Sequence, residues 1–134
     1  TDYVTIASAG DATDFGNLVD GWQSGGCACS NVRFVFCGGR TTSGGNQDVM
    51  QYFTIASTGN STDFGDLTTA TKDNNNGGAN GVRGITNMGG TTGSTIDVIE
   101  YITIASTGDA TDFGNTLGAC NRGGAMSWHL AAVL

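Results

Sequence analysis

The chain is poor in residues that several protein classes need. Its 134 residues include no proline, one lysine (Lys72), one histidine (His129) and one glutamate (Glu100). With five basic residues and a net charge of -7, it lacks the clustered basic side chains that neutralise phosphates, so no nucleic-acid partner is expected. No apolar run approaches the roughly 18 residues of a membrane-spanning helix, so membrane insertion is not expected either.

Catalytic and metal-binding groups are equally scarce. The single histidine supplies at most one zinc ligand, and the four cysteines include no Cys-x-x-Cys pair. His129 has no serine or cysteine nucleophile at a suggestive spacing, and no local pattern supplies the paired carboxylates of a glycosidase. The sequence therefore predicts a non-enzymatic protein without a cofactor or a metal.

The cysteines permit two structural interpretations. Cys37 ends an apolar segment, where a cysteine usually serves as a small buried apolar residue. In an oxidising environment, Cys27 or Cys29 is an alternative disulfide partner for Cys37. The connectivity, including that of Cys120, does not follow from the sequence.

What the chain has in abundance is turn and strand residues. It contains 23 glycines and many threonines, serines and asparagines, while leucine and glutamate, which favour helices, are rare. Hydrophobic residues make up 38% of the chain, enough for a modest core in one domain. This composition predicts a turn-rich all-β protein.

One long sequence segment, which we call the repeated phrase, occurs three times at a spacing of 49 residues. Tyr3, Tyr52 and Tyr101 begin the segments YVTIASAGDATDFG, YFTIASTGNSTDFG and YITIASTGDATDFG. Such fidelity indicates one copied supersecondary unit whose copies bury their apolar faces against each other. We expect a single repeat domain over residues 1–134, with units 1–49, 50–98 and 99–134.

Each copy predicts a similar series of elements. An apolar strand (residues 3–8 in the first copy) leads into a turn with a glycine and an aspartate or asparagine. A phenylalanine and a leucine then return to the core, and a second strand follows at 32–36, 82–85 and, in the third copy, 126–134. The core residues expected from this series are Phe15, Phe64, Phe113, Leu18, Leu67 and Leu117.

The same aspartate of the repeated phrase is present in all three copies, as Asp14, Asp63 and Asp112. A catalytic group is needed only once, so a residue present three times is interpreted as structural. We expect these side chains to cap backbone N–H groups in Asx-type turns. The alternative is a calcium site that adds Asp11 or Asp109, although the Asp-x-Asp-x-Asp-Gly order of calcium loops is absent.

Four residues outside the repeated phrase are candidates for contact with a ligand or partner. Trp22 lies in the polar segment DGWQSGG and is expected either at a surface contact or folded back as a cap. Arg40 begins the loop 40–46, which joins the loops 19–26 and 72–81 as an expected recognition surface. Trp128 and His129 lie in the apolar segment 126–134, where burial in the core or in a subunit interface is the simpler interpretation.

The second strand of each copy, together with the first strand of the next, resembles a blade of the kelch family. The residues that carry this resemblance are VRFVFCGG, VMQYFTIAS and the segment from Phe64 to Leu67. The repeat length agrees, while the aromatic position holds phenylalanine where kelch blades prefer tryptophan. The resemblance implies propeller-type blades.

The repeated phrase also resembles a group of repeat-bearing virion proteins of tailed bacteriophages, notably phages of aquatic bacteria. The segments IEYITIASTGDATDFG and GCACSNVRFVFCGG carry this resemblance, which covers all three copies and diverges after Gly118. It implies a tail, fibre or capsid-associated structural protein located in the virion. Its partners would be itself and other virion proteins.

Three blades are too few to close a propeller ring, which needs at least four. We therefore expect a homo-oligomer, with six blades in a two-fold dimer, or a fragment of a longer propeller. A β-trefoil or β-prism is the alternative architecture for three copies. The alternative functions are a carbohydrate-binding module that recognises a host-surface glycan and an extracellular fibre subunit.

Overall fold

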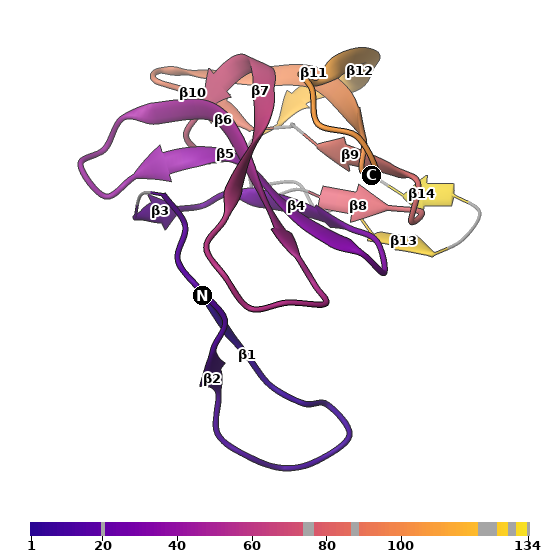
Figure 1. The fold of residues 1–134 in the computed structure, drawn as a ribbon. Coiled ribbons are helices and arrows are strands. Elements are labelled where there is room, and N and C mark those ends of the chain that lie inside the picture. The colour runs from indigo at the N-terminus through magenta and orange to yellow at the C-terminus, as the bar shows by residue number, and fades with distance from the viewer. Residues whose placement is uncertain (20, 74–76, 87–88, 121–125, 129–130, 134) are drawn as a thin grey trace.

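The structure is a computed structural model that describes residues 1–19, 21–73, 77–86, 89–120, 126–128 and 131–133, with side chains up to residue 119. Every regular element in these ranges is a β-strand, and all strand pairs are antiparallel (Figure 1). The expectation of an all-β protein is thus confirmed. The described strands form several separate sheets, and none of these sheets closes on itself.

The strands vary from two to ten residues in length. In chain order they are β1 (Asp2–Tyr3), β2 (Thr13–Asp14), β3 (Trp22–Gln23), β4 (Gly26–Cys29), β5 (Arg33–Thr41), β6 (Asn46–Thr54), β7 (Thr62–Thr71), β8 (Gly77–Ala79), β9 (Arg83–Thr86), β10 (Gly90–Thr91), β11 (Ser94–Thr103), β12 (Thr111–Cys120), β13 (Met126–Trp128) and β14 (Ala131–Val133).

Two larger sheets share one plan. In the first, β5 pairs with β6 and β6 with β7, while β3 and β4 pair with successive parts of the other edge of β5. In the second, β11 pairs with β12, while β9 and β10 pair with successive parts of its other edge and β8 pairs with β9. Each sheet therefore has four strand positions, one of which is interrupted.

The same plan extends to the register. Tyr52 lies opposite Val35 and Thr62 in the first sheet, and Tyr101 lies opposite Ile85 and Thr111 in the second. Each sheet combines the second half of one sequence copy with the first half of the next. Two partial sheets flank this arrangement: β1–β2, made from the first half of copy one, and β13–β14, made from the second half of copy three.

The phrase Thr-Ile-Ala-Ser forms a turn, which corrects the prediction of a strand over residues 3–8. Strand β1 ends at Tyr3, and Ser8 N donates a hydrogen bond to the Thr5 carbonyl at 3.2 Å. The same bond joins Ser57 to Thr54 at 3.3 Å and Ser106 to Thr103 at 3.1 Å. Alternating apolar residues favoured a strand, but the chain must reverse direction here so that the two arms of each copy can pair.

The predicted C-terminal strand over 126–134 is also corrected. Two short strands, β13 and β14, occupy the segment and pair with each other, with Ser127 opposite Ala132. The strand expected over residues 32–36 continues, as β5, to Thr41, and Gly38 and Gly39 lie inside it at a register shift, with φ of 54° and 113°. Only glycine adopts such values readily, so β5 bends without ending.

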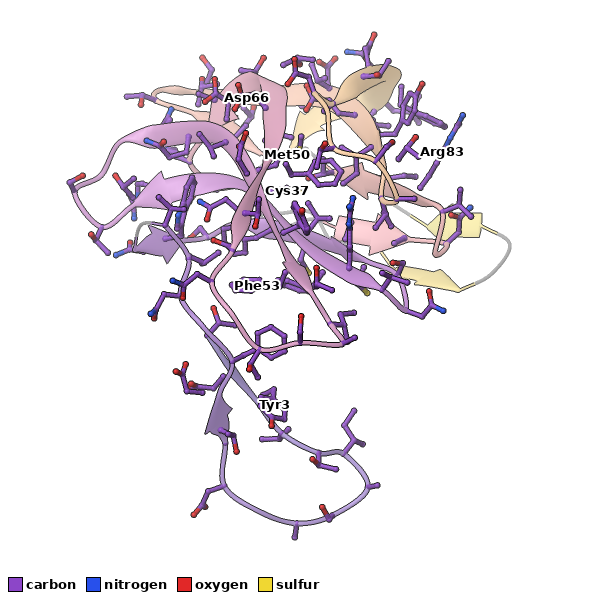
Figure 2. All side chains as sticks on the ribbon, viewed as in Figure 1. Tyr3, Cys37, Met50, Phe53, Asp66 and Arg83 are labelled. Atoms are coloured by element: carbon purple, nitrogen blue, oxygen red, sulfur yellow. The ribbon has the colours of Figure 1, made fainter. Side chains whose placement is uncertain are left out.

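The core lies between the two larger sheets. Val35, Cys37, Met50 and Phe64 of the first sheet pack in one buried cluster with residues of the second sheet and its loops. Figure 2 shows Cys37 and Met50 at the centre of the molecule, away from Tyr3 in the projecting β1–β2 hairpin. The members of the cluster from the second sheet and its loops are Ile102, Ile104 and Ala110.

Of the three leucines expected in the core, only Leu67 is fully buried; Leu18 is half-buried and Leu117 is exposed. The register explains the failure at Leu117. Asn115 pairs with Val98 as Asp66 pairs with Val49, so Thr116, not Leu117, takes the place of Leu67.

Candidate functional site

The candidate contact residues Trp22 and Arg40 lie on adjacent strands. Gln23, next to Trp22 in β3, pairs with Arg40 in β5, and its Oε1 accepts a hydrogen bond from Arg40 Nη2 at 3.3 Å. The Trp22 ring meets the Phe36 ring edge-on at 5.9 Å between centroids. Trp22 Nε1 and Arg40 Nε are buried without a hydrogen-bond partner among the described residues.

Trp22 also borders an open recess beside the β1–β2 hairpin. Its other lining residues are Thr1, Asn17, Leu18, Val19 and Gly21. The other two candidates are not placed with this group. The backbone of Trp128 belongs to β13, its side chain is not described, and His129 lies outside the described residues.

The repeated tyrosines and phenylalanines pair with one another inside each copy. The rings of Tyr3 and Phe15, Tyr52 and Phe64, and Tyr101 and Phe113 lie 5.8, 6.0 and 6.1 Å apart in edge-on geometry. Edge-on pairs at such distances are favourable beyond the area that they bury. The pairs give every copy the same local aromatic unit.

Two of these tyrosine rings are each covered by an arginine side chain. The Arg33 guanidinium lies 4.4 Å from the centroid of the Tyr52 ring, and Arg83 lies 4.5 Å from that of Tyr101. Arg33 also donates from Nη1 to the Ile104 carbonyl at 3.2 Å, which links the two larger sheets. Arg83 holds the equivalent position over Tyr101 in the second sheet, and its side chain is exposed.

Two of the repeated aspartates act within their own turns. Asp14 Oδ1 accepts a hydrogen bond from Gly16 N at 3.1 Å, and Asp112 Oδ1 accepts one from Gly114 N at 3.0 Å. Asp63 is exposed and lies opposite Gln51 in the β6–β7 ladder. In the part of the chain that the structure describes, no group of three histidine, cysteine or carboxylate side chains is placed to hold a metal ion.

The repeated phrase makes its most distinctive contacts between copies. At the first contact, Gly59 N donates to the Phe15 carbonyl at 2.8 Å, and Ser61 N donates to the Asn17 carbonyl at 2.9 Å. The side chains of the second copy accept in return. Asn17 N donates to Asn60 Oδ1 at 3.1 Å, and Val19 N donates to Gln51 Oε1 at 3.0 Å.

The second contact repeats these four bonds 49 residues later. Its donors and acceptors are Gly108 N to the Phe64 carbonyl at 2.7 Å, Ala110 N to the Asp66 carbonyl at 2.8 Å, Asp66 N to Asp109 Oδ1 at 3.0 Å and Thr68 N to Glu100 Oε1 at 3.0 Å. We call each such set of four bonds a joint. We name the segments 15–19, 64–68 and 113–117 donor segments; in a formed joint, such a segment contributes two carbonyl groups and two N–H groups. We name the segments 10–12, 59–61 and 108–110 receptor loops.

Glycine is required where a joint brings two backbones together. A Cβ atom on Gly16 would collide with the Gly59 carbonyl oxygen, and one on Gly65 would collide with the Gly108 carbonyl oxygen. The equivalent Gly114 has no atom within 4 Å of the same position. The first two donor segments are therefore engaged, and the third is open among the described residues.

The buried end of the joint depends on residues that the motif analysis missed. Gln51 and Glu100 are both buried, and each accepts the last backbone N–H of a donor segment. A signal was present in the sequence, because the residue before each repeated tyrosine is polar: Asp2, Gln51 and Glu100. A polar residue inside an apolar strand is expected to have a hydrogen-bond partner.

Asp66 carries an unfavourable charge at the second joint. Partial desolvation at the joint, together with the nearby carboxylates of Asp48, Asp109 and Asp63, raises the pKa of Asp66, whose side chain is still exposed (labelled in Figure 2). The folded state thus binds this proton more tightly than the unfolded chain. The resulting penalty is absent below the ordinary aspartate pKa and is complete above the raised value.

Asp66→Asn is therefore expected to raise the free energy of unfolding at pH 7 by less than about 1 kcal/mol, since Asp66 is exposed. The gain should disappear at about pH 3, where the wild-type carboxyl is protonated. Urea unfolding at both pH values measures it, with Asp97→Asn as a control for the loss of one charge. A gain of equal size at both pH values would contradict this cause. The first and third copies have asparagine, Asn17 and Asn115, at the position equivalent to Asp66.

The cysteines occupy contrasting environments. Cys27 and Cys29 are exposed free thiols on β4, so neither forms the bridge to Cys37 that was considered from the sequence. Burial is the main cause that raises the pKa of Cys37 to about 12, with smaller contributions from Cys27 and Glu100 against an opposing hydrogen bond from Thr86. A thiol with this pKa supplies almost no thiolate at neutral pH.

We expect Cys37 to resist alkylation in the native protein at pH 8 and to react once urea unfolds the chain. Peptide mass spectrometry after a short iodoacetamide pulse distinguishes it from Cys29, which is exposed and serves as the internal comparison. Native labelling of Cys37 at the rate of Cys29 would show that the two sheets separate readily.

The described residues contain no helix long and apolar enough to span a membrane. No protein-family model matches the chain, and no curated protein is significantly similar to it.

Proposed function

We propose that this chain is a non-enzymatic structural protein that assembles with copies of itself through its β-repeats. The observation that carries the proposal is the joint. The repeated phrase and the residues beside it form the same four hydrogen bonds twice, at positions 49 residues apart. A contact that recurs between successive copies is typical of a scaffold whose units stack in series.

The larger sheets are compatible with propeller-type blades, because each has four antiparallel strand positions. Under this proposal, two chains contribute six blades to one ring. A trefoil or prism remains the alternative arrangement. Electron microscopy of the purified oligomer distinguishes them, since a six-bladed ring has a central channel and a trefoil does not.

Self-assembly is tested by sedimentation velocity over a range of protein concentrations. The net charge of -7 makes copies repel one another, so the measurement is made at about 0.15 M and 0.5 M salt, where screening is effective. We expect an oligomer whose population rises with protein concentration. A monomer under every condition would contradict the proposal.

For the biological setting, we propose a bacteriophage virion, in its tail, fibre or capsid-associated parts, with other virion proteins as partners. The resemblance of the repeated phrase to virion proteins of tailed phages supports this setting. Immunogold labelling of purified particles tests it, with particles of an unrelated phage as the control. Labelling of host-derived filaments instead would favour an extracellular fibre subunit.

A second candidate function is recognition of a host-surface glycan at the recess beside Trp22. Tryptophan stacks on sugar rings, and here the indole borders an open recess with Asn17 at its edge. A glycan array probed with the wild-type protein and with Trp22→Ala tests it. Signal that the variant loses would favour a lectin, and an array without signal would leave the structural role.

A further inference from the structure

We propose that the chains associate head to tail. The open donor segment 113–117 of one chain would bind the free receptor loop 10–12 of a second copy and form a third joint there. This inference rests on the proposed self-assembly, for which it specifies the contact. It commits to a second copy of this chain as the occupant, because the molecule already contains the same contact twice.

We call the end of the molecule with the segment 113–117 the tail. It exposes a phenylalanine whose equivalent in the second joint is buried. Phe64 and Phe113 have the same tyrosine partner geometry, yet Phe64 is 2% exposed and Phe113 is 56% exposed. The difference arises because the third copy covers Phe64, whereas no described residue covers Phe113 in that way. An exposed aromatic residue on an unpaired sheet face is a typical binding anchor.

We call the end of the molecule with the loop 10–12 the head. It exposes apolar side chains of the first copy. The isoleucine of the repeated turn is 99% exposed at Ile6, 44% at Ile55 and 1% at Ile104. Val4 is also exposed, although the equivalent Phe53 and Ile102 are buried. The isoleucine that the third copy buries in the core cluster, Ile104, therefore has an exposed equivalent in the first copy.

Each polar group of a joint is also present at the two ends. Asp11 stands where Asn60 and Asp109 accept hydrogen bonds, and Asp2 stands where Gln51 and Glu100 accept them. Four bonds would therefore cross the new contact. They are Gly10 N to the Phe113 carbonyl, Ala12 N to the Asn115 carbonyl, Asn115 N to the Asp11 carboxylate and Leu117 N to the Asp2 carboxylate.

The backbone supports the same pairing. A complete sheet consists of two strands from the second half of a copy followed by two from the first half of the next. Strands β13 and β14 are the first pair of such a sheet, and β1 and β2 are the last pair. Strand β13 contacts β8 as β8 contacts β4. The β13–β14 pair therefore lies next to the second sheet as the second sheet lies next to the first.

Within one chain these two half-sheets do not meet. Figure 1 shows the β1–β2 hairpin projecting from the body on one side and β13–β14 lying beside β8 on another. A second chain would bring its β1 to the edge of β14 that pairs with no other described strand, and would complete the four positions. Arg83, exposed at this end, would donate to the Ile6 carbonyl of that chain, as Arg33 donates to the Ile104 carbonyl.

This contact is heterologous, because it joins two different surfaces of the same chain. Two chains that bind each other at both ends form a closed dimer with six sheets. Chains that cannot close in this way form a filament. In either case, blocking one end of every chain abolishes assembly, while mixing chains blocked at opposite ends restores a single contact.

The test uses three substitutions that leave the net charge unchanged. Phe113→Asn blocks the tail and Ile6→Asn blocks the head, and both replace exposed side chains, so the monomer should fold normally. Val32→Asn is the matched control. Val32 is 56% exposed, as Phe113 is, and it lies between β4 and β5 of the first sheet, outside the segments of the proposed contact. Circular dichroism checks the fold of each variant.

We expect sedimentation velocity to show assembly of the wild type and of Val32→Asn. Phe113→Asn and Ile6→Asn should each be monomeric, with self-association weakened at least about 100-fold, as expected for a buried apolar anchor. An equimolar mixture of Phe113→Asn and Ile6→Asn should form a 1:1 heterodimer, which neither variant forms alone.

The outcomes separate this inference from the broader proposal. If the wild type stays monomeric, both self-assembly and the head-to-tail joint are wrong. If the wild type assembles and both blocked variants assemble equally well, only the joint is wrong. The joint is also overturned if a single block suffices while the other has no effect, or if the mixture yields no heterodimer, since either result indicates an isologous contact.

Discussion

Phe64→Ala is expected to lower the free energy of unfolding by about 3–5 kcal/mol, whereas Phe113→Ala should lower it by less than about 1 kcal/mol. Phe64 is almost completely buried between the two larger sheets and packs in the cluster with Met50. Its removal leaves a cavity that the rigid strands cannot fill. Phe113 loses only the exposed contact with Tyr101.

The comparison is unusually well matched, because both phenylalanines follow a Thr-Asp pair, precede a glycine and meet a tyrosine in the same geometry. Urea unfolding of dilute protein, at concentrations where the chain is monomeric, measures both variants. Equal losses would mean that the third copy does not cover Phe64, which would contradict the stacking of the two sheets. The assembled protein should lose stability from either substitution.

Gly65→Ala should cost about 2–5 kcal/mol, and Gly114→Ala about 1–3 kcal/mol. Both glycines have φ of 137°, so both variants carry the strain of placing a Cβ atom in that conformation. Only Gly65 adds a collision with the Gly108 carbonyl oxygen. The difference between the two variants therefore isolates the close approach of the backbones in a formed joint.

Thermal and urea unfolding of the two monomeric variants give this difference directly. Gly118→Ala, at an ordinary position without a neighbour within 4 Å, controls for the effect of the added methyl group on the unfolded chain. If Gly65→Ala and Gly114→Ala are equally destabilised, the collision at the joint is relieved by a shift of the loop. A larger loss at Gly114 would contradict the structure of the second joint.

The joints make stability a property of neighbouring copies. Each copy has its own tyrosine–phenylalanine pair, but the acceptors Gln51 and Glu100 serve a donor segment from the preceding copy. In such a linear array, the gain from each added copy comes chiefly from its interface with the one before. Among the described residues, the receptor loop of the first copy and the donor segment of the third copy therefore take part in no joint.

Several features followed from the sequence because their causes are local. The triplicated phrase, the glycines and the scarcity of helix formers predicted an all-β repeat protein, and the described strands are all β. Asp14 and Asp112 bond to glycine N–H groups two residues ahead, an interaction that needs no distant residue. A short-range pattern suffices for such contacts.

Other features were decided only by the tertiary structure. Alternation of apolar residues favoured strands at the Thr-Ile-Ala-Ser phrases, where the chain turns. The β11–β12 ladder keeps the register of the β6–β7 ladder, so Thr116 and not Leu117 takes the place of Leu67. The burial of Phe64 and the exposure of Phe113 are the clearest case. Their local sequences are nearly identical, and the difference lies in a neighbour 49 residues away, which no local pattern encodes.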